Sequence, residues 1–269
     1  MKKYSYLDIP RPYWTNTSTP EEIYNDLLSF ATAFINIDSR FTILEDISGL
    51  RGSYGGIVYI GFNGENIPIM AFCNPYNYSS YYYRGFALTL VDQNMYPRCG
   101  ESFGSFGTHT SGYMSWECNS TSYKNTKIRV WYRSFGEILS FDIGLYASTQ
   151  SESNLARWFI AKLTSLTETK EYYFNLYQLY NASCYYSIMG APTSANGFNL
   201  LTYATRVAGR YYMLEVGLEL TTYKLKDIFY FSGTQVTTTP CSFIFNGVEY
   251  QTLGQQYSNC WTLCVKITE

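Results

Sequence analysis

The sequence is poor in the residues that most enzymes use, because its 269 residues include a single histidine, His109. Nucleophilic catalysis by serine or cysteine normally needs a histidine as base, so one histidine in a Gly- and Thr-rich stretch gives little support for such a site. The chain also has no Gly-x-Ser-x-Gly elbow, phosphate-binding loop, dinucleotide fingerprint or His-Glu-x-x-His motif. We therefore expect a protein that is not an enzyme and that uses no cofactor.

Charged residues are also scarce, at 15% of the chain, and the formal net charge is −2. Without a run of Lys or Arg there is no attraction for a phosphate backbone, so we expect no direct contact with nucleic acid. No stretch approaches the roughly 20 apolar residues of a membrane span, and the start of the chain has no apolar segment before Pro10 and Pro12. Neither a membrane span nor Sec export is predicted.

The cysteines do not form a recognisable framework, because there are seven of them and they are widely scattered. Free thiols in a reducing compartment fit this pattern best. Cys260 and Cys264 would share one face of a strand, but no Cys-x-x-Cys and no histidine pair accompanies them, so no zinc site is predicted. An Asp-x-Asp-x-Asp-Gly calcium loop is missing too, and the prediction for metals is none.

Tyrosine is the residue present in excess, with 29 copies in the chain. Its rigid ring ends in a hydroxyl, which suits a contact that is packed on one side and wet on the other. A β-rich core also favours tyrosine, and this interpretation stays open beside that of a dedicated aromatic binding surface. In both cases the composition indicates contact surfaces.

A helix is predicted over residues 18–35, where Thr19 is the N-cap, Pro20 occupies the first helical position and Glu22 completes a capping box. Apolar residues then follow at helical spacing and form one stripe. They are Ile23, Leu27, Phe30 and Phe34, widened by Tyr24, Leu28, Ala31 and Ile35. We expect this stripe to pack against a sheet, with partner docking as the alternative.

After residue 41 the pattern changes to short apolar and aromatic runs separated by Gly, Asn, Ser and Pro, which is typical of antiparallel β proteins. Strands are predicted at residues 41–46, 56–62, 67–72, 86–91, 127–133, 137–145, 172–180, 211–220, 228–231, 242–245, 248–253 and 262–267. Tight hairpin turns are expected at Asn63-Gly64, at Ser134-Phe135-Gly136 and at Asn246-Gly247. Residues 153–166 fit a helix or a strand, and we favour the strand.

The predicted fold is mainly β, an antiparallel sandwich or barrel-like set of sheets with one N-terminal amphipathic helix and a small C-terminal β module. Residues 1–225 would form the main domain and residues 226–269 the module. Residues 100–125 are long for a loop without structure, which often marks a functional excursion. The candidate interface takes aromatic residues from this stretch and from the tyrosine runs: Tyr81, Tyr82, Tyr83, Phe103, Phe106, Tyr113, Trp116, Tyr185 and Tyr186.

Paired carboxylates could still hydrolyse a glycosidic bond, since that reaction needs only two Asp or Glu side chains close in space. The carboxylates in aromatic-rich surroundings are Glu101, Glu117, Glu137 and Asp142. Ordinary surface carboxylates explain them more simply, so a polysaccharide-degrading enzyme is the third of three hypotheses.

Residues 225–233, 243–254 and 261–267 look like the small β module at the end of virion structural proteins of tailed bacteriophages. Residues 41–46, 55–61, 128–137 and 156–161 are similar to tail-associated proteins of large phages and prophages. The resemblance implies a non-enzymatic virion component, in the tail or baseplate, that is assembled in the host cytoplasm.

On this resemblance, the expected partners are copies of the chain and other virion proteins. A ring or tube subunit presents a patch and its complement on different faces and so buries its sheet edges. The alternative hypothesis is a carbohydrate-binding or receptor-binding tail protein, because Tyr and Trp rings stack on sugars while Asn, Ser and Thr supply hydrogen bonds. In that case a host surface glycan is a further partner.

Overall fold

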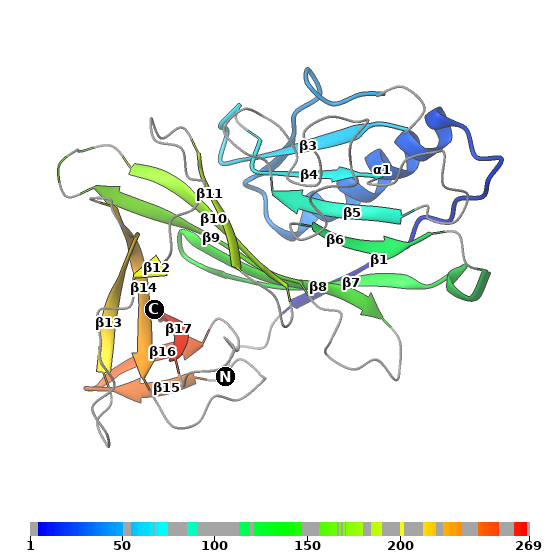
Figure 1. Cartoon of the computed structure of the whole chain (residues 1–269). Coiled ribbons are helices and arrows are strands. Elements are labelled where there is room, and N and C mark those ends of the chain that lie inside the picture. The colour runs from blue at the N-terminus through cyan, green and yellow to red at the C-terminus, as the bar shows by residue number, and fades with distance from the viewer. Residues whose placement is uncertain are drawn as a thin grey trace.

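The structure is a computed structural model, and its description covers residues 5–50, 55–66, 68–74, 85–90, 113–118, 121–146, 156–165, 167, 169, 171–179, 184–189, 200–201, 212–218, 223–232, 242–252 and 261–267. These residues build two antiparallel sheets and one long helix, arranged as a small sheet with the helix and a larger sheet that curls into a half-barrel (Figure 1). The predicted mainly β fold with one N-terminal helix is confirmed.

Helix α1 spans Pro20–Phe34 and begins with the predicted capping box. The Thr19 hydroxyl accepts a hydrogen bond from the Glu22 backbone N–H at 3.2 Å, and the Glu22 carboxylate accepts one from the Thr19 N–H at 2.8 Å. These bonds satisfy two donors at the start of the helix. The buried residues of the helix are Ile23, Leu27, Phe30, Ala31 and Phe34. The predicted apolar stripe is therefore confirmed, and the 3-10 helix η1 (Ile35–Ile37) follows it.

The small sheet has five strands that pair in sequence order. They are β2 (Phe41–Ile43), β3 (Ile57–Phe62), β4 (Met70–Cys73), β5 (Gly85–Leu90) and β6 (Tyr113–Glu117). Every residue of β3 is buried, because both of its faces are covered. Val58 and Ile60 join the core that contains α1, whereas Tyr59 packs with Leu44 and Ile47 on the other face.

Gly55, just before β3, allows the helix to lie close to this sheet. Its φ is +96°, which L side chains rarely adopt, and a Cβ at this position would overlap the side chain of Ile23. Glycine is thus needed for two reasons at one position, its backbone conformation and the space beside it.

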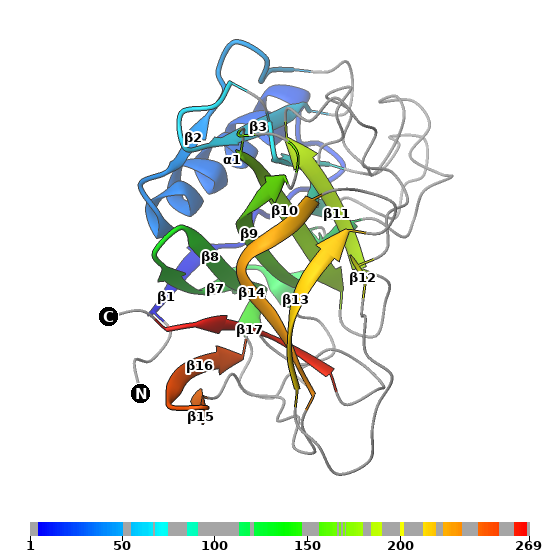
Figure 2. The same cartoon turned by 90° about the vertical axis from the view of Figure 1, so that its left-hand side faces the viewer.

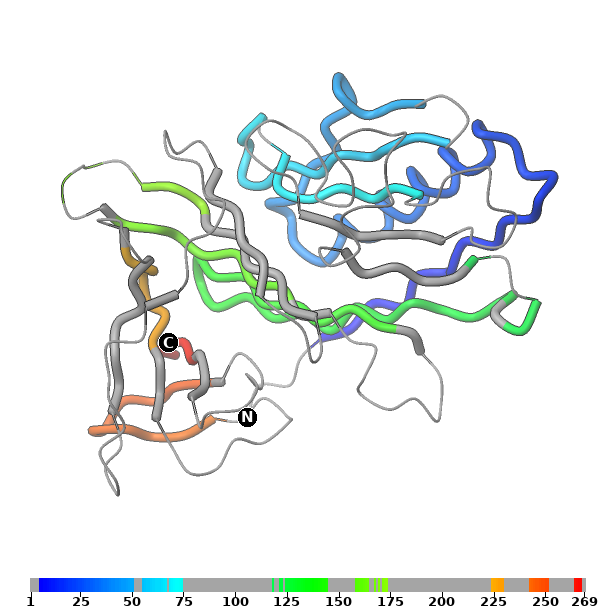
Figure 3. The backbone as a smooth tube through the Cα atoms, viewed as in Figure 1, coloured from blue at the N-terminus to red at the C-terminus, as the bar shows by residue number. Residues whose placement is uncertain are grey.

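The large sheet has twelve strands. Its main path contains, in spatial order, β1 (Ser5–Pro10), β7 (Lys127–Phe135), β8 (Ile138–Tyr146), β9 (Ala156–Ser165), β14 (Tyr223–Ser232), β17 (Trp261–Lys266), β16 (Val248–Thr252) and β15 (Ser242–Phe245). Four more strands branch from it, namely β10 (Glu171–Leu179), β11 (Cys184–Met189), β12 (Leu200–Leu201) and β13 (Tyr212–Leu218). In Figure 3 the helix is blue, β7–β9 are green and the described C-terminal strands are orange to red.

One hydrophobic core joins α1, the small sheet and the β1–β7–β8–β9 part of the large sheet. The Phe34 ring lies at its centre, with its centroid 5.2 Å from that of Phe72 on β4 and 5.4 Å from that of Phe41 on β2. On β8 and β9, the rings of Phe141 and Trp158 stack in the same core at 5.7 Å. The helix and both sheets therefore share one interior and hold each other in place.

The large sheet branches along β9. β10 pairs with residues 156–164 on one edge of β9, while the other edge is shared by β8 at residues 156–160 and β14 at residues 163–165. β14 then leaves β9 after Leu225 and pairs with β17 from Ile228 onward. Figure 2 shows the curl that results, with β14 and β17 turned away from β8 and β9.

A bulge in β14 produces this change of partner. On β13, Glu215 and Gly217 are two residues apart, but their partners on β14, Phe229 and Lys224, are five residues apart. β14 therefore has three extra residues between these two pairs. Asp227 lies in the extra segment with a φ of +59°. Bulges bend a strand and increase its twist. The bulge therefore bends β14 between the part that pairs with β9 and the part that pairs with β17, which curls the sheet into the half-barrel. The predicted boundary between residues 225 and 226 falls inside β14, and the domain division stays a prediction.

The turn predictions hold best at the C-terminal hairpin. Asn246 and Gly247 have φ values of 48° and 77° and connect Phe245 directly to Val248, as predicted. Positive φ at both positions is what a type I′ turn requires.

The tight connection between β7 and β8 is Gly136-Glu137, which begins two residues later and ends one residue later than predicted, because β7 continues through Phe135 to pair with Ile138. The φ of Gly136 is 61°, which fits glycine at the first central position of a type II′ turn.

The prediction at Asn63-Gly64 is right in conformation and wrong in loop length. Both residues have positive φ, 58° and 76°, and the Glu65 N–H bonds to the Phe62 carbonyl across the turn. However, β3 and β4 pair only from Ile60 and Met70, so the loop is longer than two residues.

Most strand predictions agree with the structure within a few residues, and residues 156–165 form β9, as favoured. The strand predicted at 41–46 is shorter, because the chain turns after Ile43. β1, β6, β11 and β12 were not predicted. Residues 100–125 contain β6 and the 3-10 helix η3 (Thr121–Tyr123), and residues 100–112 and 119–120 lie outside the described part. The functional excursion expected in this stretch stays a prediction.

Candidate functional site

The first candidate is a row of cationic and aromatic side chains on β1 and β7, here called the β1–β7 outer face. Alternate residues of β7 point to opposite sides of the sheet. Ile128 and Val130 point into the core and are fully buried. The opposite side carries Tyr6, Asp8, Lys127, Arg129, Trp131, Arg133 and Phe135, which define this face.

Arg129 is the centre of the β1–β7 outer face. Its Nε and one terminal nitrogen donate to the two carboxylate oxygens of Asp8 at 2.6 and 2.7 Å. The guanidinium lies 4.1 Å from the centroid of the Tyr6 ring and 5.9 Å from that of Trp131. A bidentate ion pair holds the guanidinium plane in one orientation, so the two aromatic residues flank a fixed cation.

This arrangement places a large aromatic residue at an edge of the sheet. Tyr6 is 59% exposed although it lies over Arg129. The hydrogen bonds from Arg129 lower the pKa of Asp8, against a smaller raising effect of burial. The face therefore presents a rigid ring, a paired ion and further cationic side chains, which suits binding to a surface or to a polar ligand with flat apolar faces.

A second candidate lies where the sheet branches, at the tip of the β7–β8 hairpin. Glu137 in the turn, Lys162 on β9, Glu171 on β10 and Lys226 on β14 form a group of four alternating charges, here called the charge quartet. Lys162 contacts Glu137 at 2.5 Å and Glu171 at 2.9 Å, and Lys226 contacts each of the two glutamates at 3.3 Å. Each charge thus has two opposite neighbours.

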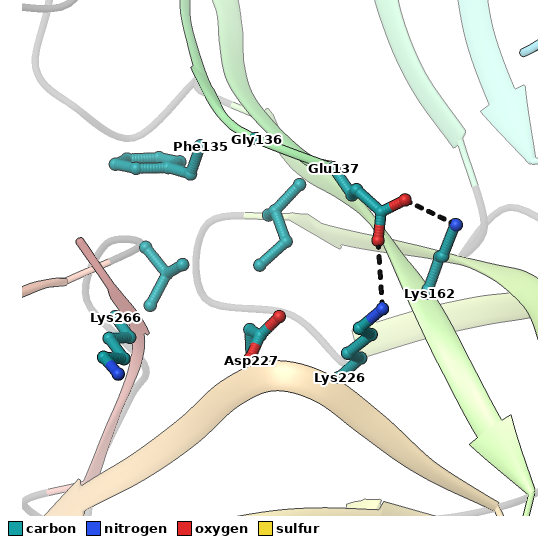
Figure 4. Close-up of a pocket in the computed structure, with 9 residues that line it drawn as sticks. Phe135, Gly136, Glu137, Lys162, Lys226, Asp227 and Lys266 are labelled. Carbon is teal, nitrogen blue, oxygen red and sulfur yellow. Dashed lines mark hydrogen bonds and ion pairs between the residues drawn. The ribbon is translucent and has the colours of Figure 1, made fainter. Parts of the chain in front are cut away.

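A hollow of about 190 Å³ lies beside the quartet (Figure 4). It is lined by the hairpin tip, by the lysines of the quartet, by Asp227 in the β14 bulge and by Val265 and Lys266 of β17. It is smaller than the roughly 300–1,000 Å³ of ordinary ligand pockets. The hollow is the space left open where β9 changes its partner from β8 to β14.

The charge quartet favours structure over acid–base chemistry. Hydrogen bonds from Lys162 are the main cause that lowers the pKa values of Glu137 and Glu171, with Lys226 adding to the effect. The same bonds raise the pKa values of Lys162 and Lys226. A general acid in glycoside hydrolysis needs a raised carboxyl pKa, so Glu137 has the opposite tuning.

Arg40 fastens the same hairpin tip to the small sheet. Its guanidinium donates to the carbonyls of Gly136 and Glu137 at 3.3 and 3.0 Å and to the Asp38 carboxylate at 2.9 Å. Burial raises the pKa of Asp38, but the hydrogen bonds from Arg40 outweigh it and lower the pKa overall. Nearby, the Asn63 amide donates to the Tyr173 hydroxyl of β10 at 2.5 Å. The branch point and the small sheet are therefore bound together by polar contacts.

The predicted interface residues are distributed over regions that the structure describes only in part. Tyr81, Tyr82, Tyr83, Phe103 and Phe106 lie outside the described residues. Tyr113 and Trp116 lie on β6, opposite Thr89 and Phe86 of β5, and Tyr185 and Tyr186 lie on β11, opposite Tyr177 and Leu176 of β10. The predicted interface stays a prediction.

Of the predicted carboxylates, Glu137 belongs to the charge quartet, and Asp142 lies on β8 opposite Trp131 and Arg157. Glu117 lies on β6, and Glu101 and His109 lie outside the described residues. Cys73, Cys118 and Cys264 are buried and form no disulfide, which agrees with the prediction for these three.

Sequence reasoning missed Tyr6, Arg129, Lys162, Glu171 and Lys226. A signal existed for the β7 part, because residues 127–135 alternate Lys, Arg, Trp, Arg and Phe with other residues, and strand alternation would place all five on one face. The quartet left no local signal, since its members come from four separate elements.

Within the described residues, no three His, Cys, Asp or Glu side chains gather in a way that could hold a metal ion. No helix in that part of the chain is long and apolar enough to cross a membrane. The chain matches no protein-family model, no curated protein and no solved structure.

Proposed function

We propose that this protein is a non-enzymatic structural component of a bacteriophage particle, located in the tail or baseplate, that acts through contacts with copies of itself and with other virion proteins. The observation that carries the contact role is the β1–β7 outer face, where Arg129 is held between Asp8, Tyr6 and Trp131. Tyr, Trp and Arg are the residues most enriched at energetically important interface positions. The phage assignment rests on the resemblance of the strand segments.

The pairing of charges in the charge quartet supports the same proposal. In the described part of the chain, the carboxylates of the charge quartet are paired with lysines and have lowered pKa values. Such groups stay ionised at neutral pH and stabilise the branch point. This pairing is what a scaffold needs, because it ties the β7–β8 hairpin, β9, β10 and β14 together where the large sheet branches.

The test is the presence of the chain in particles. Mass spectrometry of virions purified from the host that carries the gene should find it at a fixed copy number. Trp131→Ala and Arg129→Ala should reduce incorporation at least tenfold, whereas Thr121→Ala, an exposed position in η3, should not. Purified virions without the chain, together with a protein that stays monomeric and binds no virion protein, would contradict the proposal.

A carbohydrate-binding or receptor-binding tail protein is the second candidate, and the same face favours it. The exposed Tyr6 ring can stack on a sugar, while Asp8 and Arg129 can bond its hydroxyls. A glycan array should then show binding that Tyr6→Ala abolishes. If no glycan on the array binds the protein, and Tyr6→Ala does not change the binding of the protein to host cells, this candidate is excluded.

A polysaccharide-degrading enzyme is the third candidate, and the lowered pKa of Glu137 weighs against it. The test is whether the protein releases reducing sugars from host envelope. If it does, and Asp142→Asn or Glu117→Gln abolishes the release, the enzyme becomes the first candidate.

A further inference from the structure

Among the described residues, the strand β15 forms one end of the large sheet and pairs only with β16. In a two-residue hairpin the residues that flank the turn bond to each other, so Phe245 and Phe243 direct their backbone groups toward β16. The N–H and C=O groups of Ser242 and Ile244 therefore point away from the sheet. Neither residue makes a backbone hydrogen bond beyond the β15–β16 ladder within the part of the chain that the structure describes.

Within the described part of the chain, this edge carries no charged residue, proline or bulge that would prevent pairing with another strand. Its sequence is Ser-Phe-Ile-Phe, without charge and without proline, and the Ile244 side chain is 75% exposed. Natural sheet edges are commonly blocked by charged residues, proline or bulges. The opposite end of the sheet has both kinds of block, because β1 contains Asp8 and ends at Pro10.

We propose that β15 pairs antiparallel with β15 of a second copy of this chain around a two-fold axis, so that Ile244 lies opposite Ile244 of that copy. This inference names one partner and one surface for the contact role and so rests on the proposed function. The pairing would continue the sheet through both molecules and cover the most exposed large apolar side chain of the described residues.

Charge does not oppose this pairing. The single charged residue of the β15–β16 hairpin is Glu249, which lies opposite Ile244 on β16. In the paired form the two Glu249 side chains would be three strand spacings apart, about 14 Å for strands spaced about 4.8 Å. This distance exceeds the screening length of about 8 Å at physiological ionic strength, so the two carboxylates repel each other little.

The size of the contact sets its strength. β15 has four residues, so the pairing buries less area than the roughly 1,200–2,000 Å² of stable interfaces. The dimer should therefore be weak in dilute solution, with a Kd of about 10 μM or more, and should gain strength where neighbours in a particle raise the local concentration.

Disulfide trapping tests the register directly. Opposite residues of an antiparallel pair have Cα atoms about 4.5–5.5 Å apart, within the range that a disulfide can bridge. Under mild oxidation Ile244→Cys should give a dimer linked through residue 244, identified by peptide mapping. Glu249→Cys is the matched control, because its two copies would be about 14 Å apart and should not be linked.

Sedimentation velocity over a concentration series gives the second readout. Ile244→Lys should abolish the concentration-dependent dimer, while Leu50→Lys, which adds the same charge at another exposed apolar residue, should leave it. Circular dichroism checks that both variants fold. A dimer that persists in Ile244→Lys, no dimer at any concentration, or equal linking at 244 and 249 would overturn the proposal.

The outcomes separate this inference from the proposed function. A chain that is found in virions but shows no linking through residue 244 would refute the β15 pairing alone. A dimer linked through residue 244 in a protein that is missing from virions would refute the phage role and leave the pairing in place.

Discussion

The ring of Phe34 on α1 packs edge-on against the ring of Phe141 on β8, with the two centroids 5.4 Å apart. This contact joins the helix directly to the large sheet, while other contacts of Phe34 reach the small sheet. A single side chain therefore connects the three parts of the core.

Phe34→Ala should lower the free energy of unfolding by about 3–5 kcal/mol, because it removes a fully buried ring and leaves a cavity between three elements. Urea denaturation measures the loss. Ile244→Ala, at an exposed position, should cost less than about 0.5 kcal/mol at low protein concentration. Equal effects of the two substitutions would show that Phe34 is not a core residue.

Gly55→Ala and Gly64→Ala form a matched pair for the approach of α1 to β3. Both glycines have positive φ, but a Cβ at Gly55 would overlap Ile23, whereas a Cβ at Gly64 would meet nothing within 4 Å. Gly64→Ala should cost about 1–2 kcal/mol from backbone strain alone. Gly55→Ala should cost at least about 2 kcal/mol more in the same thermal or urea measurement, and similar costs at both positions would contradict the close approach.

The charge quartet predicts a loss of stability in acid. The folded pKa values of Glu137 and Glu171 lie below the ordinary value of 4.5, so their stabilising effect is complete above that pH and is lost as the pH falls through the lower folded values. Both side chains are partly exposed, at 50% and 37%, which limits the total effect to about 1 kcal/mol.

Urea midpoints measured from pH 6 to pH 3 check this prediction. The variant Glu137→Gln/Glu171→Gln should be less stable at pH 6 and should lose less stability on acidification than the unsubstituted chain. Glu45→Gln is the control, because Glu45 is exposed and makes no ion pair among the described residues. If the double variant and the unsubstituted chain have parallel pH profiles, the quartet contributes nothing.

The thiol of Cys264 should be unreactive in the folded protein. It is fully buried on β17, and burial raises its pKa to about 12. Since the thiolate is the reactive form, iodoacetamide at pH 8 should leave Cys264 unmodified in native protein and modify it in urea, as mapped by mass spectrometry. Equal labelling in both conditions would contradict the buried position.

The parts of the fold that depend on neighbouring residues in sequence could be predicted. The capping box of Thr19 and Glu22 is a four-residue pattern, and the type I′ turn at Asn246-Gly247 needs only two residues that accept positive φ. The apolar stripe of α1 follows from helical spacing. Such signals are local, so no knowledge of the tertiary structure is required to find them.

The candidate sites depend on which strands become neighbours, and the sequence does not contain this directly. Asp8 and Arg129 form their ion pair across 121 positions, because β1 joins the edge of a sheet built much later in the chain. Lys226 reaches Glu137 only because β14 changes its partner at a bulge. β1 itself was missed since a short run ending in proline gives a weak strand signal.

The bulge around Asp227 also has a mechanical meaning. Backbone hydrogen bonds run without a break from β1 through the bend to β15, so the two ends of the sheet are joined by peptide ladders and not by a flexible linker. A pull on the C-terminal hairpin would therefore be carried as shear between paired strands to the far edge. A sheet built in this way can pass load from one of its ends to the other while keeping its shape.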